Sequence, residues 1–260
     1  MLRFYKYQGT GNDFVMIDNR TSFFPKEDKE LVAHLCHRRF GIGGDGLILL
    51  EEAEGYDFRM LYYNADGSES TMCGNGGRCL VAFAKQLKII NDNCRFIAID
   101  GEHTATISSE GIVSLQMINV SGIEIEKSYS FLNTGSPHHV QVVRDLGNYD
   151  VFGIGQEIRE SELYAPGGTN VNFVEQEGPN HFRIRTFERG VEDETLSCGT
   201  GATAVAISMY AQGKCDHNEV KIDVEGGSLT ISFETEDRIS YRNVVLSGPA
   251  KLAFEGTIQI

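Results

Sequence analysis

Short runs of hydrophobic residues, bounded by glycine or charged residues, recur along most of the chain. Runs of this length that are rich in Val, Ile, Tyr and Phe are typical of buried β-strands. The pattern predicts strands at residues 47–50, 59–63, 95–100, 104–107, 112–118, 139–143, 171–175, 182–187, 220–224, 228–233 and 241–246.

Two longer segments, residues 76–87 and 201–212, are hydrophobic almost all round. A helix that is apolar on every face belongs inside a structure. A third segment, residues 26–38, has the amphipathic pattern of a helix on a surface. The sequence therefore predicts an α+β fold in which strands wrap around two buried helices.

The chain contains an internal repeat, in which motifs recur in the same order 124 positions apart. Such collinear matches indicate an ancient duplication, so we expect two pseudo-symmetric domains that face each other across a two-fold axis. Each should be a mostly antiparallel or mixed sheet around one central buried helix. We expect the domains to comprise residues 1–118, completed by a closing strand from 250–260, and residues 119–249. The matching motifs are Thr10-Gly11 with Thr134-Gly135, Gly43-Gly44 with Gly167-Gly168, and Phe58-Arg59-Met60 with Phe182-Arg183-Ile184.

Composition narrows the class of protein. With 41% hydrophobic and 23% charged residues, the chain has the make-up of a soluble globular protein. It has no secretory signal and no apolar run near the roughly 18 residues of a membrane span, so we expect a cytoplasmic location and no membrane partner. A net charge of −14 argues against nucleic acid as a partner.

The segments with the most chemical information are 69–77 and 194–202, which place Cys73 and Cys198 just before glycine-rich helix starts. At a helix N-terminus, unpaired N–H groups and the helix dipole stabilise a thiolate, and so lower the pKa of the cysteine from its usual value of about 8.5. The same N–H groups can grip a carboxylate. Two such ends would hold a carboxylate-bearing carbon between two thiols, which is the geometry for inverting a stereocentre by two-base chemistry.

The other four cysteines are expected to be reduced and buried in the core, as cysteine usually is in a domain without a secretory signal. They are Cys36, Cys79, Cys94 and Cys215. The spacing of Cys73 and Cys79 fits no common zinc pattern, so we expect no metal.

The acidity of the substrate sets a further requirement. The α-proton of an amino acid is far less acidic than a thiol, and no pyridoxal-type electron sink is evident in the sequence. The site would have to stabilise the carbanion with converging dipoles and by excluding water. We therefore expect a closed pocket between the halves, and no cofactor.

Further motifs of the chain are Gly9-Thr-Gly-Asn-Asp-Phe14, Gly41-Ile-Gly-Gly-Asp45, Tyr63-Asn-Ala-Asp-Gly-Ser68, Met72-Cys-Gly-Asn-Gly-Gly-Arg78, Gly135-Ser-Pro-His138, Glu188-Arg-Gly190 and Ser197-Cys-Gly-Thr-Gly-Ala202. These motifs resemble those of the diaminopimelate epimerase family. The resemblance implies an isomerase that interconverts LL- and meso-diaminopimelate without pyridoxal phosphate, for lysine and peptidoglycan synthesis. It also implies two like α+β domains and a homodimer.

The resemblance also implies roles for individual residues. Cys73 and Cys198 match the family's acid/base pair, and His138 and Glu188 match residues that assist the thiols and the α-amino group. Four further residues match positions that hold the distal amino and carboxyl groups of the substrate: Asn12, Asn64, Asn170 and Arg189. The backbone of two dipeptides matches the cradle of the α-carboxylate: Gly74-Asn75 and Gly199-Thr200.

The chain departs from the family pattern at two places. Ser136 stands where the family often has asparagine, and its shorter side chain needs a water to reach the same ligand atom. The segment Glu188-Arg-Gly-Val-Glu-Asp-Glu-Thr195 is one residue longer than usual and lacks a second glycine. Both departures concern recognition of the distal end of the substrate.

Two alternative functions are consistent with the same residues. One is another racemase or epimerase with two cysteines, similar to proline racemase, although a proline ring has no need of Arg189 or the asparagines. The other is a redox or structural protein in which Cys73 and Cys198 form a switchable disulfide. Incorporation of solvent deuterium into diaminopimelate separates an epimerase from a redox protein.

Overall fold

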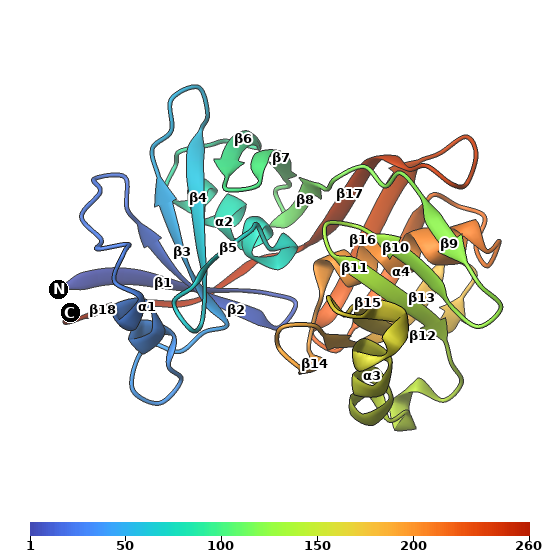
Figure 1. Ribbon diagram of the computed structural model, residues 1–260. Helices are drawn as coiled ribbons and strands as arrows, with labels where there is room; N and C mark the ends of the chain where they lie inside the picture. The colour runs from blue at the N-terminus through green and yellow to red at the C-terminus, as the bar shows by residue number, and fades with distance from the viewer. The chain divides into compact units, whose positions relative to one another are not determined.

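The computed structural model describes residues 1–260, which form two compact units (Figure 1). Unit 1 comprises residues 1–115 and 248–260, and unit 2 comprises residues 116–247. The elements of unit 1 are β1 Leu2–Gly9, β2 Asn12–Asp18, α1 Lys29–Cys36, β3 Gly46–Glu51, β4 Phe58–Asn64, β5 Glu69–Ser70, α2 Gly74–Gln86, β6 Asn93–Ala98, β7 Gly101–Ile107, β8 Ile112–Gln116 and β18 Lys251–Ile258.

The strands of unit 1 form a mixed sheet. The β2–β3 and β4–β6 pairs are parallel, and the β1–β2, β3–β4, β4–β5, β6–β7 and β7–β8 pairs are antiparallel. β18, from the end of the chain, pairs antiparallel with β1, so that Leu2 lies opposite Ile258 and the two termini lie close together (Figure 1).

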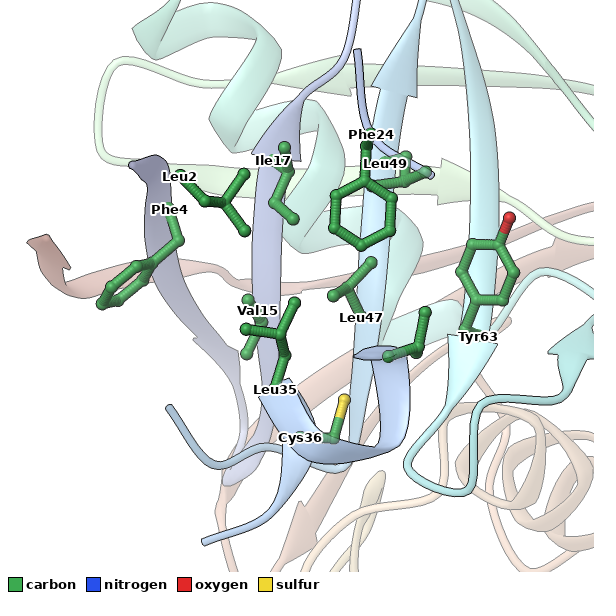
Figure 2. Close-up of a cluster of buried hydrophobic side chains, with 11 residues drawn as sticks. Leu2, Phe4, Val15, Ile17, Phe24, Leu35, Cys36, Leu47, Leu49 and Tyr63 are labelled. Carbon is green, nitrogen blue, oxygen red and sulfur yellow. The ribbon is translucent and has the colours of Figure 1, made fainter. Parts of the chain in front are cut away.

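One face of this sheet packs against α1 (Figure 2). Val15 and Ile17 of β2 and Leu47 and Leu49 of β3 belong to one buried cluster with this helix. Leu35 contributes from the helix itself and, like these four side chains, is completely buried. Burying each side chain of this size contributes about 1.5–3 kcal/mol. Asp28 fixes the start of α1, because its side chain accepts a hydrogen bond from the backbone N–H of Leu31.

The opposite face of the sheet packs against α2. Phe14 and Ile48 point to this side, and a Cβ on Gly76 of the helix would lie 3.0 Å from Cδ1 of Ile48 and 3.5 Å from Cε1 of Phe14. Gly76 is therefore required for the close approach of helix and sheet. Because both faces of the sheet are covered, β2 and β3 have nearly continuous apolar runs instead of alternating ones.

Unit 2 repeats this order of elements after a short additional strand, β9 Ile123–Ile125. Its pairings repeat those of unit 1, with parallel β11–β12 and β13–β15 pairs and antiparallel neighbours elsewhere. The remaining elements are β10 Ser130–Asn133, β11 Pro137–Val142, α3 Val151–Glu160, β12 Asn170–Gly178, β13 His181–Glu188, β14 Asp193–Thr195, α4 Gly199–Ala211, β15 Glu219–Val224, β16 Gly227–Glu234 and β17 Arg242–Pro249.

The repeat extends to the register of the strands. In unit 1, Phe14 lies opposite Gly46, and in unit 2, His138 lies opposite Asn170, each residue 124 positions later. The two units therefore have one fold, and the predicted α+β class with a mixed sheet around a buried helix in each half is confirmed.

The two helices predicted to be buried are confirmed as α2 and α4, and the amphipathic helix as α1. Both buried helices begin two residues earlier than predicted, directly after Cys73 and Cys198. The sequence pattern did not predict α3, because Gly153 and Gly155 lower its helix propensity. α3 occupies the place of α1 in the repeat and has an equivalent N-cap, in which Asp150 accepts a hydrogen bond from the N–H of Gly153.

Candidate active site

Cys73 and Cys198 occupy the N-cap positions of α2 and α4. Both have extended backbone conformations, and neither side chain caps its own helix. Their carbonyls accept the first bonds of each helix, from Gly77 at 2.7 Å and Ala202 at 2.9 Å. The first turn of each helix consequently presents amide groups that have no partner within the helix, beside the thiol.

In unit 1, Asn12 links the thiol to the first turn of α2. Its Oδ1 lies 3.8 Å from Sγ of Cys73 and accepts a hydrogen bond from Nδ2 of Asn75 at 3.3 Å. Its Nδ2 donates to the carboxylate of Asp45, which Arg38 holds at 2.6 Å. Three predicted residues, Asn12, Cys73 and Asn75, are thus brought together within one unit.

Asn64 ends β4 at the same edge of the sheet. The register of β2, β3 and β4 places Phe14, Gly46 and Asn64 in one row, and Asn12 lies two residues before Phe14. The backbone N–H of Asn64 donates to the carbonyl of Ser68 at 2.9 Å, and its Nδ2 lies 3.3 Å from the Ser68 hydroxyl. These bonds hold Asn64 in the turn that follows the strand.

In unit 2, a chain of hydroxyl groups leads from a histidine to the second thiol. Ser136 Oγ lies 3.0 Å from Nε2 of His138 and 3.3 Å from Oγ1 of Thr200. Oγ1 of Thr200 lies 3.4 Å from Sγ of Cys198. Asn170 also donates to Ser136 Oγ, at 3.1 Å. Ser136, at the first departure from the family pattern, therefore has three partners within its own unit.

His138 is neutral, and its tautomer follows from its partners. Burial, with a smaller contribution from the positive charge of Arg189, lowers the pKa of His138 to about 3. Nδ2 of Asn172 donates to the carbonyl of His139 at 2.9 Å and approaches Nδ1 of His138 at 3.1 Å, while Thr186 donates to its Oδ1. Nδ1 must accept, so Nε2 carries the proton and donates to Ser136.

This tautomer gives the hydroxyl chain a direction. Ser136 accepts from His138 and Asn170, so its own proton points to Thr200, and the proton of Thr200 points to Cys198. The sulfur of Cys198 therefore faces a hydroxyl donor, which favours its thiolate form.

Glu188 and Arg189 lie where β13 ends. Oε2 of Glu188 accepts a hydrogen bond from the hydroxyl of Thr195 at 2.9 Å. The backbone N–H of Arg189 donates to Oδ1 of Asn170 at 2.9 Å, and its guanidinium has one protein partner, the carbonyl of Gly167 at 3.3 Å. Arg189 forms no ion pair, so its charge remains available for an anionic ligand.

The extra residue in the segment between Glu188 and Thr195 is absorbed by a turn. Glu192 adopts a positive φ of 59°, accepts a hydrogen bond from the N–H of Gly190 at 2.9 Å and pairs with Arg159 at 2.9 Å. The chain then forms β14 beside β13. The insertion leaves Glu188 and Arg189 in the strand end that the repeat assigns to Asn64.

The two groups of residues occupy equivalent places in the repeated fold. At an offset of 124, Asn12 corresponds to Ser136, Phe14 to His138 and Asn64 to Glu188, and at an offset of 125, Cys73 corresponds to Cys198 and Asn75 to Thr200. Gly201 corresponds to Gly76, and a Cβ there would collide with Oδ1 of Asn172. Each unit therefore carries a cysteine with neighbouring polar residues at the same point of the fold.

Sequence reasoning missed Asn172 and Thr186, which fix the tautomer of His138. Both are completely or almost completely buried within strands, where the surrounding hydrophobic pattern indicates only core packing. Their polar character was the available signal, because a buried polar side chain requires hydrogen-bond partners. The four cysteines predicted to be structural are buried and free.

No helix of the chain combines the length and the apolar character that crossing a membrane requires. No group of three or more His, Cys, Asp and Glu side chains is arranged to hold a metal ion.

The chain is similar over its whole length to known diaminopimelate epimerases. The family model described as diaminopimelate epimerase matches residues 4–121 and 130–253. A diaminopimelate epimerase of Flavobacterium psychrophilum is 60% identical over 257 residues, covering 99% of this chain and 100% of the relative. One from Chlorobaculum tepidum is 44% identical, covering 97% and 99%.

Solved structures with low sequence identity share the fold. A phenazine biosynthesis protein of the PhzF family from Bacillus anthracis has a TM-score of 0.78 at 13% identity, covering 100% of this chain and 99% of that one. A probable proline racemase from Agrobacterium radiobacter, solved with bound carbonate, has a TM-score of 0.71 at 15% identity, covering 100% and 93%.

Proposed function

The chain belongs to the diaminopimelate epimerase family, and from this premise we propose that it interconverts LL- and meso-diaminopimelate by proton transfer between Cys73 and Cys198. The observation that carries the proposal is the repeat: both units have a cysteine at the same point of the same fold, directly before a helix N-terminus. The reaction supplies a precursor for lysine and peptidoglycan synthesis.

The reaction requires one thiolate and one thiol. The thiolate removes the proton from the α-carbon and becomes a thiol, and the electron pair of the C–H bond remains on the substrate as a carbanion. The other thiol then delivers its proton to the opposite face and becomes a thiolate. No atom is gained or lost, and the configuration of the carbon is inverted.

The weak acidity of the α-proton is offset by the two helix starts. We propose that the amides of Gly74-Asn75 and Gly199-Thr200 bind the α-carboxylate, where negative charge develops as the proton leaves. Preorganised dipoles of this kind need no reorganisation during the reaction, which is why they stabilise a transition state more than water does. This chemistry needs no cofactor.

The remaining residues divide between the two ends of the substrate. We propose that Arg189 binds the distal carboxylate, since its guanidinium forms no ion pair within the protein. Asn12, Asn64 and Asn170 bind the distal polar groups, and Oδ1 of Asn170 keeps one lone pair for a ligand besides the bond from Arg189. His138, a neutral donor, supports Cys198 through Ser136 and Thr200, and Glu188 binds the α-amino group.

Incubation with LL-diaminopimelate in deuterated water, without added pyridoxal phosphate or metal, tests the proposal. We expect the meso product to form and one deuterium to enter the α-position of each product molecule, because the proton delivered has exchanged with solvent. L-Proline serves as the matched control substrate and should acquire no deuterium. Turnover of proline instead would support a proline racemase-like activity, and no exchange into either substrate would support a redox or structural role.

We also propose that the chain forms a homodimer through β18. This strand pairs with β1 along one edge and exposes Leu252 and Phe254, by 40% and 49%. An exposed apolar edge strand is a ready site for a second copy of the chain.

The charge-introducing substitution Phe254→Glu should therefore convert a dimer to a monomer in sedimentation equilibrium. Ile239→Glu, at an equally exposed residue of unit 2, is the control and should leave the mass unchanged. A dimer that persists in Phe254→Glu would place the interface elsewhere.

A further inference from the structure

Arg78 is a completely buried arginine five residues after Cys73 in α2. Its Nη1 donates to the carbonyl of Gly74 at 3.2 Å and its Nη2 to the hydroxyl of Thr10 at 3.2 Å. Its Nε is buried without a partner, and the guanidinium forms no ion pair. The protein therefore holds a full positive charge out of water with only neutral acceptors around it.

Such a charge is unfavourable unless a negative group compensates it. Burial lowers the pKa of Arg78, and two thiols, Cys79 and Cys73, act against this effect. Cys79 is itself fully buried, which raises its pKa to about 12 and keeps it a neutral thiol. Cys73, at the helix start and only partly buried, is the remaining group that can supply the compensating charge.

The nearby carboxylates already have partners. Burial alone would raise the pKa of Asp13, but hydrogen bonds from Arg38 and Lys6 lower it to about 2. Asp100 accepts a hydrogen bond from the N–H of Met72 and lies 3.3 Å from Nε2 of His103. Neither carboxylate neutralises Arg78.

The repeat shows what is specific to unit 1. Thr203 occupies the equivalent position in α4, and its hydroxyl donates to the carbonyl of Gly199 at 2.9 Å, as Arg78 does to Gly74. The hydrogen bond is retained in both units, whereas the charge occurs in unit 1 alone. A role confined to holding the first turn of the helix would not need a guanidinium.

Two hydrogen bonds favour the opposite assignment, with Cys73 as the thiol and Cys198 as the thiolate, but both are weaker than the effect of the Arg78 charge. Oδ1 of Asn12 favours the protonated form of Cys73, but the contact is 3.8 Å long and that oxygen also accepts from Asn75. The hydroxyl of Thr200 favours the thiolate of Cys198, but it is a neutral donor. A single neutral hydrogen bond shifts a pKa less than a nearby opposite charge does, and such a charge shifts it by about 1–3 units.

We propose that Arg78 is a positioning residue that holds Cys73 as the thiolate in the substrate-free protein, so that Cys73 titrates at lower pH than Cys198. The inference deepens the proposed function, because it assigns the resting base and the resting acid of the thiol pair. The assignment can be tested without substrate, so its failure is distinguishable from failure of the proposed epimerase activity.

The first test is the pH dependence of iodoacetamide alkylation, resolved for each cysteine by mass spectrometry. In the unmodified sequence we expect Cys73 to have the lower midpoint. Arg78→Met should raise the Cys73 midpoint by about 1–2 pH units, a loss of about 10–100-fold in rate below the midpoint, and Arg78→Lys should retain most of the effect. Lys85→Met removes a charge from the same helix and should change nothing.

The second test does not depend on any variant of Arg78. Replacing Cys73 with aspartate keeps a negative charge beside Arg78, whereas asparagine removes it at equal size. Cys73→Asp should therefore have a higher denaturant midpoint than Cys73→Asn. The same comparison at Cys198 is the control, because it measures the effect of a negative charge at a helix N-terminus without a buried arginine. We expect the difference in midpoint to be larger at Cys73. Equal differences at both positions, or an unchanged Cys73 midpoint in Arg78→Met, would overturn the proposal.

Discussion

Replacing either Cys73 or Cys198 with serine is expected to lower the epimerisation rate by about 10²–10⁴-fold, the usual contribution of one general acid or base. A serine hydroxyl is a far weaker acid than a thiol, so it can neither form the resting anion nor donate a proton readily near pH 7. Because the reaction needs a thiol on each face of the α-carbon, the two variants should be similarly impaired. The measurement is the formation of meso-diaminopimelate from the LL isomer.

The control for this experiment is Cys94→Ser, which alters a buried cysteine of β6 that belongs to neither glycine-rich motif. Its rate should remain within a few-fold of the unmodified enzyme. Circular dichroism and thermal unfolding should confirm that all three variants fold. A folded Cys73→Ser or Cys198→Ser variant that keeps full activity would exclude the two-thiol mechanism.

Replacing Arg189 with alanine is expected to lower kcat/KM for diaminopimelate by about 30-fold or more, since truncating one partner of a buried charge pair costs about 2–5 kcal/mol. The variant should lose activity but keep its fold and stability, because the guanidinium has only one hydrogen bond within the protein. Arg189→Lys should recover part of the loss, as a lysine keeps the charge but not the fork geometry.

Arg183→Ala is the matched control for Arg189. It removes a guanidinium from β13, the strand that ends just before Arg189, where Arg183 pairs with Glu225 at the surface. Exposed ion pairs of this kind contribute about 0–1 kcal/mol, so kcat/KM should hardly change. If Arg189→Ala behaves like Arg183→Ala, the distal carboxylate is bound elsewhere and the substrate assignment loses its main support.

The sequence predicted the buried helices well and the site only in part. α2 and α4 were evident because they are apolar on every face and begin at a Cys-Gly motif. α3 was missed because of Gly155, whose hydrogen lies against Phe187: a Cβ there would lie 2.5 Å from the Cβ of Phe187. Packing, rather than helix propensity, decides that segment, and the offset of the repeat was the signal that would have found it.

Individual site residues followed from motifs, but their connections did not. The contact between Asn172 and His138 depends on the parallel register of β11 and β12, in which Asn170 lies opposite His138. Strand register between segments about 30 residues apart cannot be read from hydrophobic pattern alone. The burial of Arg78 was likewise invisible, since arginine is normally exposed.

The pairing of β18 with β1 has a consequence for how the chain is made. A ribosome makes β1 before unit 2, yet β18, the strand that covers its edge, is synthesised only after unit 2. Unit 2 is contiguous and can be completed while unit 1 still lacks this strand. During translation, one edge of β1 therefore stays unpaired until β18 is made. In that interval the nascent chain is most exposed to pairing with strands of other nascent chains.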